Sequence, residues 1–130
     1  MKQYDVCIIG GGAAGLAAAL SASEGKQKIV LLEGALRVGR KILASGNGRC
    51  NLLNMQDAPY FGEGDFAKAV FSHLGRAQVL SFFHALGLVT REEEGGRVYP
   101  GCGQAAAVLD VMRKALERRN VPMLCDAKVS

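Results

Sequence analysis

The sequence predicts an α/β fold organised around a parallel β-sheet. The prediction rests on an apolar run at residues 4–9, a glycine cluster that leads into an alanine-rich stretch, and a second apolar run at residues 28–33. A strand that breaks at glycines, turns into a helix and is followed by another strand is a βαβ unit, and such units form parallel sheets. We therefore predict a Rossmann-like βαβ domain that also contains a β-hairpin and a helical insertion.

The glycine cluster has the form of a phosphate-binding turn. Gly10, Gly12 and Gly15 stand at G-x-G-x-x-G spacing. The first glycine allows a tight turn at the strand end, the second lets a pyrophosphate approach the backbone, and the third lets the helix pack closely on the strand. We expect the helix to start at Ala13 and Ala14 and to run to about residue 23. Its free N–H groups and positive dipole end would then face a bound phosphate.

Glu33 supplies the second part of a nucleotide-binding pattern. It ends the second apolar run, eighteen residues after Gly15. A βαβ dinucleotide-binding fold places there a carboxylate that accepts hydrogen bonds from ribose hydroxyls. The pattern does not separate NAD from FAD, because both contain ADP. The alternative is a glycine-rich turn in an unrelated α/β domain, with Glu33 merely solvated.

Residues 34–64 form an unusually long connection, with only a short helix expected around residues 41–44. Loops of this length tend to be functional. The first half combines cations, flexible glycines and amide side chains, which can together surround an anionic ligand. The alternative is a plain surface turn. The candidate binding residues here are Arg40, Lys41, Ser45, Gly46, Asn47, Gly48, Arg49, Cys50 and Asn51.

The rest of the chain alternates helices and strands. Hydrophobic periodicity predicts helices at residues 66–74, 76–86 and 104–120, and a third strand at residues 121–125. Residues 88–92 and 97–99 flank a Glu-Glu-Gly-Gly turn, which predicts the hairpin. We expect the parallel sheet to have the spatial order third, second, first strand. His73 and His84 lack partners at ligand spacing, so we interpret both as structural.

Composition narrows the functional class. A chain of 130 residues allows one domain. No apolar run is long enough to span a membrane, and the N-terminus lacks the pattern of a signal peptide, so we expect a cytoplasmic protein. The net charge of +4 is scattered, with few aromatic residues, which argues against a nucleic-acid partner. The four cysteines show no C-x-x-C pair and no metal-site spacing, and we expect Cys7 and Cys125 to be buried.

Two longer motifs resemble a known family. Residues 39–51, and residues 95–100 followed by Gln104 and Ala105, are similar to bacterial NAD(P)/FAD-dependent oxidoreductases of the aminoacetone-oxidase-like type. The resemblance extends over all 130 residues but covers only about the first third of a typical member. Leu53 stands where threonine is common, which removes one hydroxyl. The chain would therefore be residues 1–130 of a longer flavoprotein, forming the N-terminal part of its FAD-binding domain.

The resemblance implies FAD as the cofactor, with NAD(P)H as a candidate electron donor. Residues 10–15 would hold the pyrophosphate and Glu33 the adenosine ribose. Arg40, Lys41 and residues 45–51 would extend toward the flavin. Lys128 and Val129 would lie beside the adenine and contact it mainly through the backbone.

Three functions remain open at this stage. The chain is the FAD-binding portion of an oxidoreductase for an unknown small-molecule substrate, a nucleotide-binding or scaffold fragment without turnover, or an NAD(H)-only dehydrogenase. A thiol relay at Cys50 is not expected, because no second cysteine lies nearby. We expect the 130-residue chain alone to be inactive, since the cover over the flavin would be missing. We also expect self-association through an exposed sheet edge.

Overall fold

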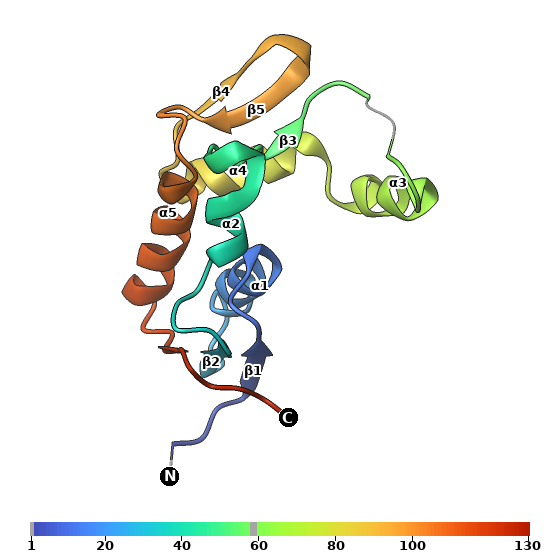
Figure 1. The fold of residues 1–130 in the computed structure, drawn as a ribbon. Coiled ribbons are helices and arrows are strands. Elements are labelled where there is room, and N and C mark those ends of the chain that lie inside the picture. The colour runs from blue at the N-terminus through green and yellow to red at the C-terminus, as the bar shows by residue number, and fades with distance from the viewer. Residues whose placement is uncertain (1, 58–59) are drawn as a thin grey trace.

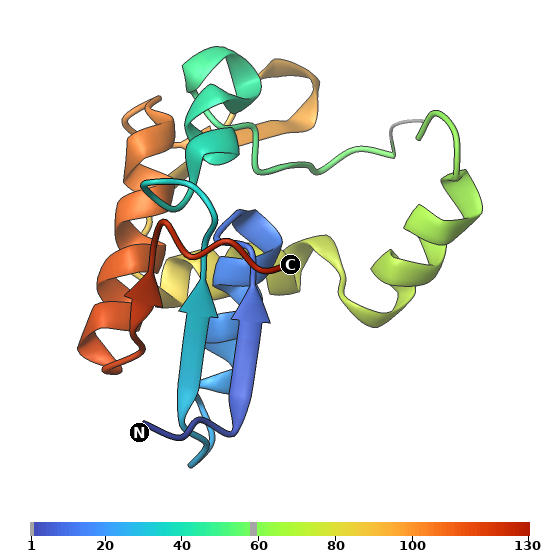
Figure 2. The same cartoon turned by 60° about the horizontal axis from the view of Figure 1, so that its bottom comes forward.

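A computed structural model describes residues 2–57 and 60–130 and confirms the predicted α/β fold. Strands β1 (Val6–Ile9), β2 (Ile29–Leu32) and β6 (Met123–Leu124) form a parallel sheet in the order β1-β2-β6, as expected. Figure 2 shows β1 and β2 side by side, with the C-terminal segment crossing at their carboxyl ends. The glycine turn therefore lies at the carboxyl ends of the parallel strands, which is where α/β proteins bind ligands.

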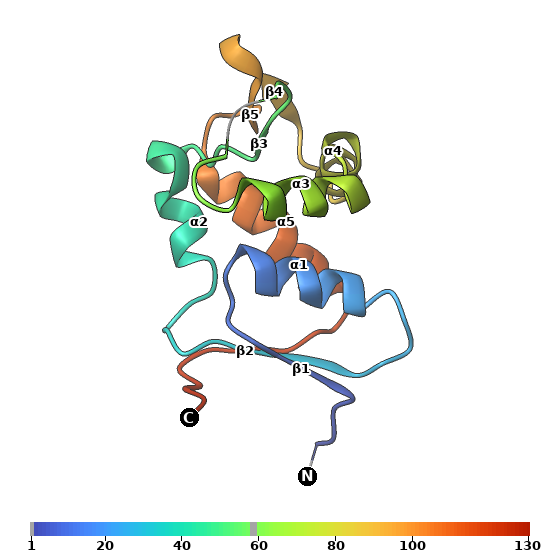
Figure 3. The same cartoon turned by 90° about the vertical axis from the view of Figure 1, so that its right-hand side faces the viewer.

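Two helices cover one face of this sheet. Helix α1 (Ala13–Ala22) connects β1 to β2, and α5 (Ala105–Arg118) leads into β6. Figure 3 shows both helices on the same side of the strands. Their apolar stripes meet β2 in a core that includes the fully buried Leu16, Leu31 and Leu116. Each such leucine stabilises the fold by about 1.5–3 kcal/mol through removal of apolar surface from water.

The opposite face of the sheet is open in the described part of the chain. Exposure alternates along β1, and Ile9 is 67% exposed. Cys7 and Cys125 are also exposed, so the prediction that both are buried was wrong. Strand periodicity predicts alternate faces correctly, but whether a second layer covers a face depends on chain elsewhere.

A second, antiparallel sheet contains the predicted hairpin. Strands β4 (Thr90–Glu92) and β5 (Arg97–Pro100) pair around a short 3₁₀ turn at Glu94–Gly96. Strand β3 (Leu53–Asn54), which hydrophobic periodicity did not predict, adds to the other side of β5. Two residues are too few to produce a periodic signal. This sheet lies beyond the helical layer and at a distance from β1 and β2 (Figure 1).

The helical insertion comprises α2 (Arg40–Ala44), α3 (Gly64–His73) and α4 (Arg76–Ala85). Helix α2 packs beside α5, whereas α3 stands away from the body (Figure 1). Arg76 fixes the start of α4, because its Nε donates to the Asn54 carbonyl at 2.7 Å. None of the described helices is long and apolar enough to cross a membrane.

Candidate nucleotide-binding site

The glycine turn follows the geometry that its spacing predicts. Gly10 has φ +100°, a conformation that side-chain-bearing residues rarely adopt. A Cβ at Gly15 would lie 1.8 Å from the Gly10 carbonyl oxygen, so only glycine lets α1 pack this closely on the turn. A Cβ at Gly12 would meet nothing within 4 Å. The bare backbone at Gly12 therefore faces open space.

Helix α1 begins directly after this turn, at Ala13. Gly12 is the N-cap residue, and no side chain caps the helix. The first N–H groups of an α-helix, here at Ala13 and Ala14, have no partner within the helix. Together with the helix dipole, they favour negative charge at this end of the helix.

The Glu33 carboxylate lines the same space as the glycine turn and holds that turn in place through a hydrogen bond. One carboxylate oxygen accepts a hydrogen bond from the Gly11 N–H at 2.7 Å, and the other accepts from the Ala35 N–H at 2.8 Å. These backbone donors, chiefly Ala35 and then Gly11, lower the pKa of Glu33, and the nearby Arg40 cation lowers it further. The carboxylate therefore stays charged at neutral pH. Each of its oxygens keeps a second lone pair for a ligand hydroxyl.

The chain after β2 folds back onto the glycine turn. The Gly39 N–H donates to the Gly11 carbonyl at 2.7 Å, and Val38 fills the space that a side chain at Gly11 would need. This contact places the start of α2 beside the turn. Sequence reasoning had not singled out Gly39, although its φ of +74° gives a conformational reason for glycine there.

These segments enclose a cavity of about 600 Å³, which we call the turn cavity. It brings together five predicted site residues: Gly10, Gly12, Glu33, Arg40 and Lys41. Arg37 also lines it and was missed, although it stands in the same basic stretch. Gly11, Ala35, Gly39 and Ala44 complete the lining. The cavity thus combines the backbone of residues 10–12, three cations and one carboxylate that can accept hydrogen bonds.

The 45–51 loop turns away from this cavity. Four of its residues, Gly46, Asn47, Gly48 and Cys50, have left-handed backbone conformations. A Cβ at Gly46 would lie 2.6 Å from the Asn51 nitrogen, so the loop is tight there. Cys50 is buried in the core, and its expected contact with the cofactor stays a prediction. Ser45, Cys50 and Asn51 line a second cavity, on the other side of α2.

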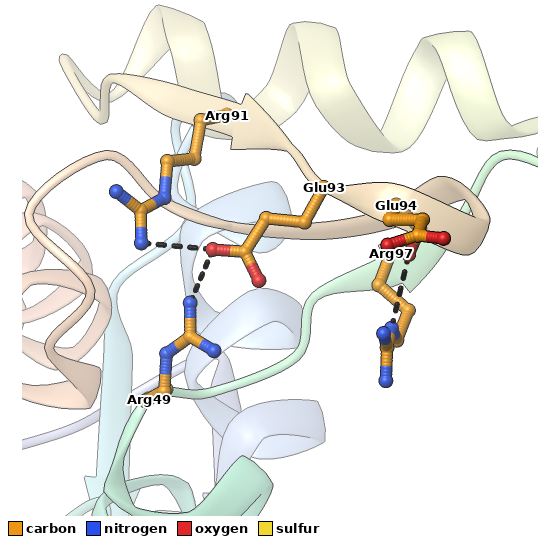
Figure 4. Close-up of polar contacts among 5 residues, drawn as sticks. All are labelled: Arg49, Arg91, Glu93, Glu94 and Arg97. Atoms are coloured by element: carbon orange, nitrogen blue, oxygen red, sulfur yellow. Dashed lines mark hydrogen bonds and ion pairs between the residues drawn. The ribbon is translucent and has the colours of Figure 1, made fainter.

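Arg49 points to the antiparallel sheet. Its guanidinium pairs with Glu93, to which Arg91 also donates at 2.8 Å (Figure 4). The guanidinium carbon also lies 4.1 Å from the centre of the Tyr99 ring. The Glu93 partner raises the pKa of Arg49, and the same pair lowers the pKa of Glu93. Arg49 does not line the turn cavity. Its partners lie more than forty residues away in sequence, which is why the loop alone gave no sign of them.

The C-terminal segment lies against the residues that follow β2. The Ala127 N–H donates to the Glu33 carbonyl, and the Asp126 N–H donates to the Ala35 carbonyl, both at 2.9 Å. Lys128 and Val129 are exposed, and the Lys128 Cα lies 3.9 Å from the position a Cβ would take on Gly34. Lys128 thus lies beside Gly34, and neither residue lines the turn cavity.

Comparison with known families agrees with this architecture. Residues 4–130 match the HI0933-like protein Rossmann domain. The chain belongs to this family. The resemblance drawn from the two sequence motifs is therefore confirmed.

Two proteins of similar sequence carry the names of a reductase and of a ribosomal RNA dihydrouridine synthase. The 3-dehydro-bile acid Δ(4,6)-reductase of Clostridium scindens is 43% identical over 127 residues, which are 94% of this chain and 31% of that protein. The ribosomal RNA dihydrouridine synthase of Escherichia coli is 29% identical, covering 93% of this chain and 31% of that protein. This chain therefore spans about a third of the length of these relatives.

A solved structure shows the same fold at much lower identity. The 3-ketosteroid-Δ4-(5α)-dehydrogenase of Rhodococcus jostii RHA1 superposes with a TM-score of 0.63 at 15% sequence identity. The match covers 95% of this chain and 38% of that structure. At this identity the match shows the fold alone.

Proposed function

We propose that residues 1–130 form the part of a flavin-dependent oxidoreductase that holds the ADP half of FAD. The turn cavity is the observation that supports this proposal most strongly. It joins the open backbone at Gly12, the uncapped N-terminus of α1 and the carboxylate of Glu33. A diphosphate needs the first two of these features, and a ribose diol needs the third.

The proposed placement uses each group for one part of the cofactor. The N–H groups of residues 12–15 would bind the pyrophosphate, helped by the positive charges of Arg37, Arg40 and Lys41. Glu33 would accept hydrogen bonds from the ribose, and Lys128 and Val129 would lie along the adenine. Ser45 and Asn51 would lie toward the flavin end. Arg49, held by Glu93, would stiffen the 45–51 loop from behind and would not touch the cofactor.

When bound, FAD would accept or deliver two electrons. The substrate is proposed to be a small molecule, with NAD(P)H as the candidate electron donor. The reductase from C. scindens favours this class over RNA, because its identity to this chain is 43% against 29% for the dihydrouridine synthase. The alternatives remain a nucleotide-binding or scaffold fragment of a longer flavoprotein, without turnover of its own, and an NAD(H)-only dehydrogenase.

Substitution of Gly12 tests the turn cavity directly. The backbone of Gly12 has φ −82°, which alanine adopts readily, and a Cβ there meets open space. Gly12→Ala should therefore fold normally and place a methyl group where the phosphate must approach. We expect ADP and FAD affinity, measured by isothermal titration calorimetry, to fall at least about tenfold, the equivalent of 1.4 kcal/mol.

Gly64→Ala is the matched control. Gly64 also has open space at its Cβ position, and it lies in the first turn of α3, away from the turn cavity. Its ADP affinity should equal that of the unsubstituted chain. Equal affinity in both variants would overturn the proposal that the turn binds the diphosphate. Comparing FAD with NADH in the same titrations separates the flavoprotein from the NAD(H)-only alternative.

A further inference from the structure

A third cavity, of about 560 Å³, lies at the amino ends of the parallel strands, and we call it the amino-end cavity. Three segments line it: the chain before β1, the turn between α1 and β2, and the turn between α5 and β6. Figure 2 shows the N-terminal segment at this end of the sheet and the C-terminal segment at the opposite end. The volume falls within the range of about 300–1,000 Å³ typical of small-molecule sites. The amino-end cavity shares no lining residue with the turn cavity, so it is a separate candidate site.

All the charged side chains that line the amino-end cavity are cations. They are Lys2, Lys26, Lys28 and Arg119. In the described part of the chain none of the four forms an ion pair, whereas Arg49, Arg76 and Arg91 each pair with a carboxylate. Cations that gather without a carboxylate between them repel one another and attract an anion. The lining therefore favours a ligand that carries several negative charges.

Arg119 is held in place at the wall of this cavity. Its Nη1 donates to the Leu20 carbonyl at 2.7 Å and to the Ser23 hydroxyl at 3.0 Å, which ties the end of α5 to the end of α1. Its Nε and Nη2 groups donate to no partner within the described residues. These two groups form the edge of the guanidinium that binds an oxyanion with two parallel hydrogen bonds. The arginine is thus already ordered for such a contact.

Helix capping explains Arg119 but not the lysines. A helix C-terminus favours a cation, and Arg119 satisfies a carbonyl at the end of α1. The three lysines lie outside both helices, so they have no such role. The acids closest to them in sequence, Asp5 and Glu24, do not line the cavity, and Asp5 accepts a hydrogen bond from the Lys28 backbone N–H at 2.7 Å. The surplus of positive charge is therefore left for a ligand.

Uncharged donors complete the lining. They are the amides of Gln3, Gln27 and Asn120 and the hydroxyls of Tyr4 and Ser23. Amide and hydroxyl groups donate hydrogen bonds to phosphate oxygens, as lysine and arginine do. Because the cations come from three segments, linked phosphate groups can pair with more of them than a single phosphate can.

We propose that the amino-end cavity binds a small polyphosphate, with one phosphate on the Nε–Nη2 edge of Arg119 and the others on the lysines. This site is independent of the proposed function, since it lies at the other end of the sheet and shares no residue with the turn cavity. A ligand bound only by the folded chain would also stabilise it, by connecting the α1–β2 and α5–β6 turns.

Inorganic triphosphate is the probe, and isothermal titration calorimetry at low ionic strength is the measurement. All titrations use the Gly12→Ala background, in which a methyl group closes the proposed diphosphate site in the turn cavity. Triphosphate should bind saturably, and inorganic phosphate at least about tenfold more weakly. Lys26→Gln and Lys28→Gln should each lower the triphosphate affinity at least about threefold, in the range of one exposed ion pair.

Lys114→Gln is the matched control. Lys114 is an exposed lysine on α5 that lies outside the cavity lining, so its loss removes the same charge from another surface. Its triphosphate affinity should equal that of the background. Absence of saturable binding would overturn the inference, and so would equal affinities of Lys28→Gln and Lys114→Gln. Equal affinity for phosphate and triphosphate would also overturn it.

Two further comparisons separate this site from other sources of phosphate and from the proposed function. An RNA oligonucleotide or phosphatidylserine vesicles that bind more tightly than triphosphate, with the same dependence on Lys28, would show that the ligand class is wrong. If Lys28→Gln loses triphosphate while Gly12→Ala keeps full ADP affinity, the proposed function fails and this inference stands.

Discussion

At the scale of a single residue, Glu33 contributes both to the fold and to the candidate site. Its carboxylate accepts hydrogen bonds from two backbone N–H groups, those of Gly11 and Ala35. The bond to Gly11 ties the end of β2 to the glycine turn. The residue therefore positions the turn in addition to its proposed contact with the ribose.

Replacing Glu33 should weaken nucleotide binding. We expect Glu33→Ala to reduce ADP affinity by about 1.5–3 kcal/mol, because it removes a charged acceptor. Glu33→Gln should have a smaller effect, since its amide oxygen still accepts. Calorimetric titration measures both, with Glu24→Ala, at an exposed residue outside the turn cavity, as the control. If both Glu33 variants bind ADP with unchanged affinity, Glu33 contributes to the fold and not to nucleotide binding.

Single residues show what sequence reasoning can and cannot reach. The structural roles of Gly10 and Gly15 could be predicted because glycine has no Cβ. The structure shows the positive φ expected at Gly10 and the close packing of helix and turn expected at Gly15. The pairing of Arg49 with Glu93 could not be predicted in the same way. From the sequence alone, a cationic side chain in a loop is equally consistent with a ligand contact and with an internal ion pair. Only its neighbours in space decide between the two.

At the scale of elements, Arg49 and Glu93 connect the 45–51 loop to the β4–β5 hairpin. Glu93 accepts from both Arg49 and Arg91 (Figure 4). The Tyr99 ring packs on the Arg49 guanidinium. Because the Glu93 side chain is 28% exposed, solvent screens this cluster only partly.

The pH dependence of stability should reveal this connection. Arg49 lowers the pKa of Glu93 below its ordinary value of 4.5. A lowered carboxylate pKa stabilises the fold at pH values above 4.5, and this contribution is lost as the pH falls through the folded-state pKa. The difference in unfolding free energy between the unsubstituted chain and Glu93→Gln should therefore be largest near neutral pH and should shrink below pH 4.5. Urea unfolding at a series of pH values measures it.

The neighbouring Glu94 provides the control for this measurement. Its side chain is exposed, and only its backbone carbonyl receives a bond, from Arg97 at 3.3 Å (Figure 4). Glu94→Gln should thus change the free energy of unfolding little. A Glu93→Gln difference that stays constant, or grows, on acidification would contradict the assigned role of Glu93.

Elements were predictable where periodicity was long or where turn chemistry was specific. Helix α5 and the β4–β5 hairpin lie where the sequence predicts them. The start of α3 was expected at residue 66, whereas the helix begins at Gly64. Strand β3 depends on pairing with a strand more than forty residues away, so no local pattern marks it.

At the scale of the whole molecule, the parallel sheet is covered on one face only by the described residues. Ile9 is 67% exposed and Leu124 is 47% exposed on the other face, and β1 pairs only with β2. In the relatives, the matched part is about a third of the protein. We propose that in a longer flavoprotein other segments cover this face and the β1 edge.

The isolated 130-residue chain should associate with itself through these surfaces. Exposed strand edges and apolar faces favour pairing with another chain, and a charge on such a surface opposes it. Ile9→Lys should therefore lower the average mass measured by sedimentation equilibrium toward that of the 13.7 kDa monomer. Leu36→Lys is the matched control, because Leu36 is 83% exposed and lies outside the sheet. If the unsubstituted chain is monomeric across the concentration range, or if both variants dissociate alike, the open face of the parallel sheet is not the contact.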